Sequence, residues 1–181
     1  INKMGLSRLD NFLKSSRGTI LYVNPNDLDA TDSIENQGNS LTRPFKTIQR
    51  ALLEAARFSY QRGLNNDRFA KTTIQVYPGD HVIDNRPGFI PDGTNNYRLR
   101  NGTTSDNLPA FDLSTNLDLA SADNNLFKLN SIHGGVIIPR GTSLVGVDVR
   151  KTKIRPKYIP SPTNSNIERS AIFRVTGGCY F

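Results

Sequence analysis

The sequence predicts a mainly β domain of short strands, joined to one amphipathic helix. Strand-like segments are broken by Gly, Pro and Asn turns, and no helical pattern separates the later ones. A single stretch has apolar residues at helical spacing, and the chain of 181 residues fits one domain with a core. Such a series suits either a solenoid of stacked coils or a β-sandwich.

The helix is the strongest periodic signal. Its apolar positions are Phe45, Ile48, Ala51, Leu52, Ala55 and Ala56, whereas Gln49, Arg50, Glu54 and Arg57 lie off that stripe. Pro44 suits the first turn, although Thr47 could equally cap a slightly later start, and Gly63 is expected to end the helix. We expect Phe45, Ile48, Leu52 and Ala55 to pack on the end of a sheet stack as the core of a helical cap.

Strands are expected where residues alternate or where β-branched residues cluster between turn residues. The expected segments are 19–23, 73–77, 81–83, 135–138, 143–146, 152–155 and 171–175. Pro78 and Gly79 predict a turn between the second and third segments.

An asparagine-rich stretch from about 84 to 131 interrupts the series. It is too long for an ordinary connection within a compact domain, so we interpret it as an inserted surface excursion. Sparse strand or turn structure is expected around 110–113 and 126–129. Decoration of the coils and contact with another subunit both remain open as its role.

Residues 1–18 form a separate unit, and residues 19–181 the domain that follows. Ser7 can cap a short helix that Gly18 closes, and its apolar stripe consists of Leu6, Leu9, Phe12 and Leu13. So short a helix is marginal in water, so the stripe needs a surface to pack on. It could cover the open end of the domain or dock on a neighbouring subunit, and we expect a docking arm.

The formal net charge of +7 raises the question of a polyanionic partner. In an extended strand Lys151, Lys153, Arg155 and Lys157 share one face, which predicts a solvated basic face or, second, a surface for an acidic partner. No aromatic residues are threaded through these cations as single-strand binders require, so nucleic acid is an unlikely partner.

Candidate chemistry is sparse, and we expect no enzyme, cofactor or metal. The acidic run Asp27, Asp29, Asp32 and Glu35 fails the calcium-loop pattern at Thr31 and Asp32. The lone Cys179 excludes an internal disulfide framework and a multi-thiolate metal site.

Two further acidic residues flank the Pro-Gly turn. Asp80 and Asp84 lie on either side of His81, where turn chemistry is a simpler role than glycoside hydrolysis. His133 is expected in a loop.

Three segments resemble the N-terminal entry of pectate-lyase-like β-helices. They are Tyr22-Val23-Asn24-Pro25, then Pro44-Phe45-Lys46-Thr47-Ile48-Gln49-Arg50-Ala51-Leu52, then Ile74-Gln75-Val76-Tyr77-Pro78-Gly79; GGVIIPRGTSLVG at 134–146 is similar to a following coil. This resemblance implies the start of a right-handed parallel β-helix, pectin-lyase-like, with one amphipathic helix capping the first coil.

Two longer stretches resemble virion structural proteins of tailed phages, most of all those of marine cyanophage myoviruses. They are RPFKTIQRALLEAARFSYQRG and RKTKIRPKYIPSPTNSNIERSAIFRVTGG. The resemblance implies a tail component of the baseplate or a tail fibre, assembled in the host cytoplasm, whose N-terminal region attaches a rigid body to the particle. Its partners would be other tail proteins and copies of itself, with a trimer favoured.

The alternative is a tailspike-type receptor-binding protein that binds or depolymerises host surface glycan. No apolar run approaches the roughly 20 residues needed to cross a bilayer, so we expect no membrane insertion. We also expect this chain to be a portion of a longer one, because it ends without a polar terminal cap.

Overall fold

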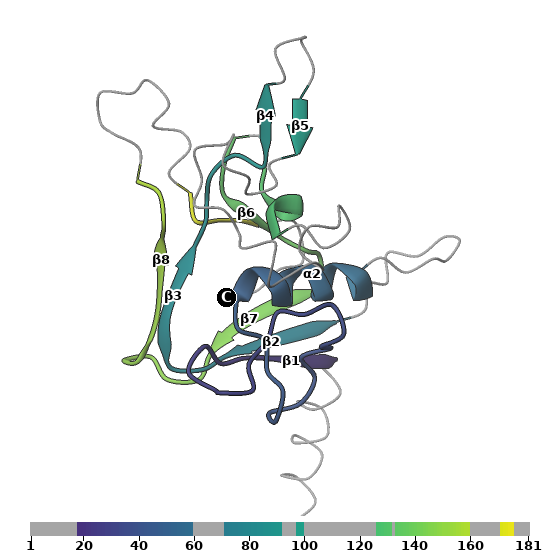
Figure 1. The fold of residues 1–181 in the computed structure, drawn as a ribbon, viewed down its shortest axis with the longest axis vertical. Coiled ribbons are helices and arrows are strands. Elements are labelled where there is room, and N and C mark those ends of the chain that lie inside the picture. The colour runs from purple at the N-terminus through teal and green to yellow at the C-terminus, as the bar shows by residue number, and fades with distance from the viewer. Residues whose placement is uncertain are drawn as a thin grey trace, which may run out of the picture.

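A computed structural model describes residues 18–59, 71–91, 97–99, 126–131, 133–159 and 171–175. Within them the protein is mainly β, with one α-helix and short parallel strands in small sheets (Figure 1). The strands are β1 (Thr19–Val23), β2 (Thr72–Val76), β3 (Gly79–Ile83), β4 (Phe89–Pro91), β5 (Tyr97–Leu99), β6 (Val136–Ile138), β7 (Thr142–Gly146), β8 (Thr152–Pro156) and β9 (Phe173–Val175). The helices are α2 (Ile48–Ser59) and a short 3-10 helix, η2 (Leu126–Leu129).

The largest sheet has three parallel strands in the order β1-β2-β7. Its register aligns Leu21 with Ile74 and Ile74 with Leu144, so one row of aliphatic side chains crosses all three strands. Alternate residues of each strand point to the same face of the sheet, and the face that carries this row lies in the core.

Two smaller sheets repeat the same parallel arrangement. β3 pairs with β8, and β6 pairs with β9. β3 follows β2 directly after the predicted turn, as β8 follows β7, so β3 and β8 run side by side away from the first sheet (Figure 1). These strands match the expected segments closely, and their parallel pairing disfavours the sandwich, which is built from antiparallel sheets.

Helix α2 begins at Ile48, later than the Pro44 start that the sequence also allowed. Thr47 is the N-cap, and its Oγ1 accepts a hydrogen bond from the Arg50 amide at 3.2 Å. The carboxylate of Asp32 supports this cap from the preceding loop, accepting the amides of Lys46 and Thr47 at 2.9 and 3.0 Å and the Thr47 hydroxyl at 2.7 Å. The cap therefore depends on a residue 15 positions upstream.

Helix α2 lies against β1, β2 and β3 (Figure 1). Phe45, Ile48, Leu52 and Ala55 are all buried in the main core cluster. The polar side of the helix is buried as well, which the sequence pattern did not predict. Gln49, Arg50 and Glu54 are at most 7% exposed. The loop between β1 and α2 contacts Arg50, the chain after β3 contacts Gln49, and Glu54 pairs with Arg50.

The asparagine-rich excursion contains a feature that the sequence reading missed, the antiparallel hairpin β4-β5. The expected structure at 126–129 is the 3-10 helix η2, which packs on α2 through Leu53 and Leu126. The other expected segment, 110–113, lies outside the described residues.

Candidate functional site

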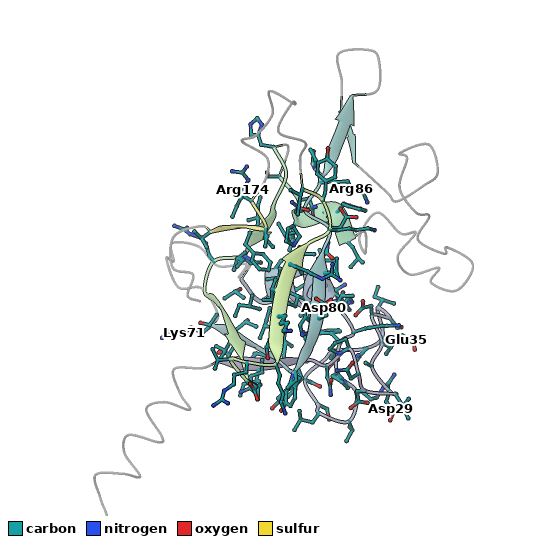
Figure 2. All side chains as sticks on the ribbon, turned by 90° about the vertical axis from the view of Figure 1, so that its left-hand side faces the viewer. Asp29, Glu35, Lys71, Asp80, Arg86 and Arg174 are labelled. Atoms are coloured by element: carbon teal, nitrogen blue, oxygen red, sulfur yellow. The ribbon has the colours of Figure 1, made fainter. Side chains whose placement is uncertain are left out.

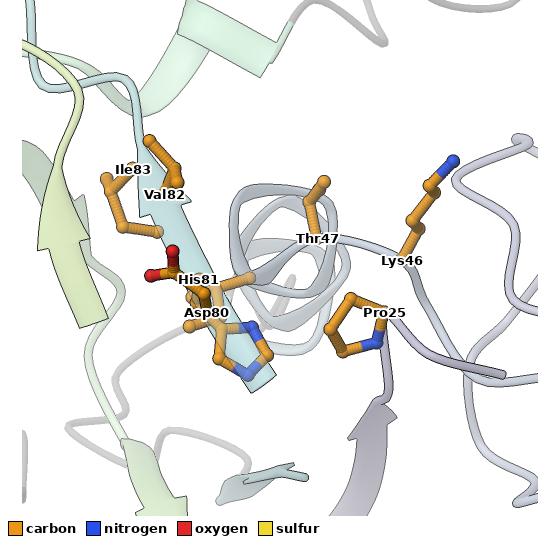
Figure 3. Close-up of a pocket in the computed structure, with 8 residues that line it drawn as sticks. Pro25, Lys46, Thr47, Asp80, His81, Val82 and Ile83 are labelled. Atoms are coloured by element: carbon orange, nitrogen blue, oxygen red, sulfur yellow. The ribbon is translucent and has the colours of Figure 1, made fainter. Parts of the chain in front are cut away.

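A pocket of about 180 Å³ lies between β3 and the start of α2 (Figure 3). Its walls come from three segments, namely Pro25, residues 46–48 and residues 80–83. It is therefore built where the first turn of the helix passes the strand that follows the Pro78-Gly79 turn.

One wall of the pocket is the free edge of β3. Gly79 donates its amide to the Lys151 carbonyl at 3.0 Å, and Ile83 accepts the Lys157 amide at 2.7 Å, so these residues direct their backbone toward β8. In a parallel ladder the intervening residues, Asp80 and Val82, direct their N–H and C=O groups the other way. Those groups therefore face the side of β3 on which the pocket lies.

Both ends of this free edge are closed by contacts. At one end Asn26 donates its side-chain amide to the Pro78 carbonyl at 2.9 Å, and a Cβ on Gly79 would lie only 2.9 Å from Pro25. At the other end Gln49 donates to the Asp84 carbonyl at 3.4 Å. The accessible edge is thus limited to about the span from Asp80 to Val82.

His81 lines the pocket but is held by the backbone. The residue is 5% exposed, and Nε2 lies 2.8 Å from the Tyr77 carbonyl. A carbonyl can only accept, so Nε2 carries the proton in this contact. The imidazole is consequently fixed in one orientation.

The two acidic residues around His81 are each engaged in ion pairs. Asp80 accepts Arg155 Nε at 2.8 Å, and this hydrogen bond holds the pKa of Asp80 below its usual value. Asp84 pairs with Arg86 and, at 3.5 Å, with Lys157. Both carboxylates are thus held by cations rather than free to act on a substrate.

The predicted basic face lies on the outer side of β8. Lys151, Lys153, Arg155 and Lys157 are all exposed, and they alternate with half-buried residues. Asp80 of β3, labelled in Figure 2, pairs with Arg155, and Asp84, which follows β3, pairs with Lys157. Half of the positive charge of this face is therefore paired with neighbouring carboxylates.

The acidic run of the first loop is dispersed. Asp32 caps α2, and burial raises its pKa despite the hydrogen bonds from Thr47 and Lys46 that oppose the shift. Asp27 accepts the Asp29 amide at 3.0 Å, and the loop carries Asp29 and Glu35 at the periphery (Figure 2). Among the described residues no three His, Cys, Asp or Glu side chains form a group that could hold a metal ion.

Arg50 is the buried charged residue that sequence reasoning missed. Its guanidinium is 2% exposed and pairs with Glu54 at 3.0 Å. It also donates to three loop carbonyls, those of Asp32, Ser33 and Asn36. The four-residue spacing of Arg50 and Glu54 indicates an ion pair, but such pairs are also common on exposed helix surfaces, so the spacing alone does not predict burial.

Several predicted residues fall outside this region. The docking stripe Leu6, Leu9, Phe12 and Leu13, and also Cys179, lie outside the described residues. His133 is exposed in the turn before β6, as expected for a loop, and its amide donates to the Ser131 hydroxyl.

None of the described helices combines the length and apolar character needed to span a bilayer.

No family model, curated protein or solved structure matches this chain.

Proposed function

We propose that this protein is a structural component of a phage virion tail, in the baseplate or a tail fibre, and that it is not an enzyme. In this proposal residues 19–181 are the first coils of a right-handed, pectin-lyase-like parallel β-helix. The N-terminal arm attaches this body to other tail proteins, and three copies associate.

One observation carries the proposal, namely the order in which the strands pair. The chain passes through β2, β3 and β6 and then through β7, β8 and β9, and each strand of the second pass pairs in parallel with the corresponding strand of the first. β1 pairs in parallel with β2 in the same way, as a strand of the preceding coil. Successive coils of a β-helix require this correspondence, because each coil lies directly on the previous one.

The physical property that such an arrangement supplies is stiffness. Parallel backbone hydrogen bonds join each of these strands to the neighbouring coil, and the aliphatic row Leu21, Ile74 and Leu144 fills the interior. Bending the stack would break several of these hydrogen bonds together. A rod that transmits force within a tail needs this resistance.

The acidic residues support the non-enzymatic proposal over a depolymerising tailspike. A glycosidase needs one carboxylate free to donate a proton and another placed across the scissile bond. Asp80 and Asp84 are instead each paired with arginine. Asp32 is committed to the cap of α2.

Deletion of residues 1–18 tests the proposed attachment. We expect the β-rich circular dichroism of the remaining chain to be unchanged, while incorporation into particles is lost. Locating the chain in intact particles by electron cryomicroscopy measures copy number and symmetry at the same time. Normal incorporation of the truncated chain would refute the docking arm, and absence of the full-length chain from purified tails would refute the function.

A further inference from the structure

We propose that the pocket beside β3 binds a short extended peptide segment of a partner protein. The segment would pair with the free edge of β3 and place an aliphatic side chain, next to a carboxylate, in the pocket. This inference goes beyond the tail assignment, because it depends only on the contacts around β3, Pro25 and the start of α2.

The backbone of β3 supplies the first argument. Asp80 and Val82 each direct one donor and one acceptor away from β8, and no other backbone group within the described residues pairs with them. Alternating donors and acceptors at the two-residue repeat of a strand are matched by the backbone of another extended chain. The backbone of an extended peptide repeats its donors and acceptors every two residues and therefore matches this edge.

The closed ends of the edge limit the length of this segment. The contacts of Pro25 and Asn26 with the Pro78-Gly79 turn block one end, and the Gln49 contact with Asp84 blocks the other. About three residues of β3 remain accessible between these points. The site therefore fits a short segment and excludes a long added strand, which protects the edge against indiscriminate pairing.

The walls of the pocket favour an aliphatic side chain. Val82 is 40% exposed at the pocket, and the buried side chains of Ile48 and Ile83 form walls beside it. The volume of about 180 Å³ is enough for about six water molecules at the volume each occupies in the liquid. Releasing such water from apolar walls is the favourable contribution expected from one aliphatic group.

The charge of Lys46 favours an acidic residue next to the aliphatic residue of the bound peptide. Lys46 lies on the pocket wall, is exposed and forms no ion pair among the described residues, whereas the carboxylate of Asp80 is already paired with Arg155. Lys46, Asp80 and Arg155 together carry a net positive charge. An aspartate or glutamate next to the aliphatic residue complements Lys46.

A small anion at the start of α2 is the competing ligand, and the structure argues against it. The amides of Lys46 and Thr47, which would bind such an anion, already donate to the Asp32 carboxylate. The Asp32 carboxylate therefore takes two amides of the helix terminus and places a negative charge beside it. The amides of Asp80 and Val82 supply free donors on β3.

Nuclear magnetic resonance titration of the whole chain with a terminally blocked tetrapeptide, acetyl-Thr-Asp-Val-Thr-amide, tests the proposal. We expect saturable shifts of the Asp80, His81 and Val82 amides at about 5 mM peptide, a concentration that nearly saturates a site with a Kd of about 1 mM. A peptide methylated on the valine nitrogen should bind about tenfold more weakly, because it lacks the donor for the strand edge.

Two protein variants locate the contacts. Val82→Pro removes the edge amide and should abolish the shifts, whereas Val82→Thr keeps that amide and should bind within about twofold of the wild type. Lys46→Gln should weaken binding of the aspartate peptide and leave the asparagine analogue unchanged. If Val82→Pro does not fold, the methylated peptide still decides.

Three results would overturn the proposal. One is the absence of shifts at Asp80 to Val82 with the blocked tetrapeptide. The second is equal binding of the methylated and unmethylated peptides. The third is stronger binding of inorganic phosphate than of the peptide at the same three amides, since that outcome would assign the pocket to an anion.

Discussion

Replacing Arg50 with methionine tests whether a buried ionic network holds the first loop against α2. The guanidinium is 2% exposed, pairs with Glu54 at 3.0 Å and lies 4.7 Å from the centre of the Phe45 ring. Its donors also reach the loop carbonyls of Asp32, Ser33 and Asn36 at 3.2 to 3.4 Å. Methionine fills a similar space but satisfies none of these groups.

The expected loss of stability follows from what the substitution leaves behind. Removing one partner of a buried ion pair costs about 3–5 kcal/mol, and the lost carbonyl contacts are part of the same network rather than additive to it. Arg57 lies 3.5 Å from the same Glu54 carboxylate and partly compensates it. We therefore expect about 3 kcal/mol, at the lower end of that range.

Urea unfolding followed by far-ultraviolet circular dichroism measures this loss. A destabilisation of about 3 kcal/mol corresponds to a Tm lower by about 6–12 °C for a chain of this size. The matched control is Arg57→Met on the same helix, where a 49% exposed side chain predicts a loss of less than about 1 kcal/mol. The double variant Arg50→Met/Glu54→Met should be more stable than Arg50→Met alone, because no carboxylate is orphaned.

The reasoning would be refuted by an Arg50→Met protein within about 1 kcal/mol of the wild type. Such a value is typical of an exposed pair and would mean that the loop does not exclude water from the guanidinium. A double variant less stable than the single one would refute the argument about the orphaned carboxylate.

Three further predictions concern the same helix and loop. Leu52→Asp, at a fully buried position, should cost more than about 4 kcal/mol in urea unfolding, and a stable variant would mean that α2 does not cover the core. Gly38→Ala should cost about 2 kcal/mol or more, because Gly38 has φ +60° and a Cβ would overlap the Phe45 ring; a neutral result would contradict this loop conformation. Burial raises the pKa of Asp32 above 3.8, so the folded state binds this proton more tightly than the unfolded state. The free energy of unfolding should therefore fall as pH rises from about 3.8 through the raised pKa. Asp32→Asn should remove this pH-dependent component, and an unchanged pH profile of unfolding in the variant would refute the prediction.

The strands were largely predictable because their determinants are local. Alternation at 73–77 and the Pro78-Gly79 turn lie within a few residues of one another, and the structure places β2 and β3 there. Valine and isoleucine between glycines likewise marked β6. In each case the sequence period and the turn residues agreed.

The features that were missed depend on distant segments. The Thr47 cap was among the predicted helix starts, but the support that it receives from Asp32 and the contact that buries Gln49 against Asp84 both come from segments that no local pattern connects. The pocket requires β3 and Pro25 to meet, and the free edge of β3 follows only from the register with β8. Helical periodicity identifies which side of a helix is apolar, but not that a second surface covers its polar side.

The loop that follows β1 has a consequence for association between molecules. Tyr22 donates its amide to Gly38 and accepts the amide of Phe45, both at 2.8 Å, so the outer edge of β1 is occupied by the chain itself. Head-to-tail growth of a filament would need this edge as well as the opposite one, on β7. The internal pairing therefore prevents another strand from adding to β1, so growth of the β1-β2-β7 sheet through a strand edge must proceed from the β7 side.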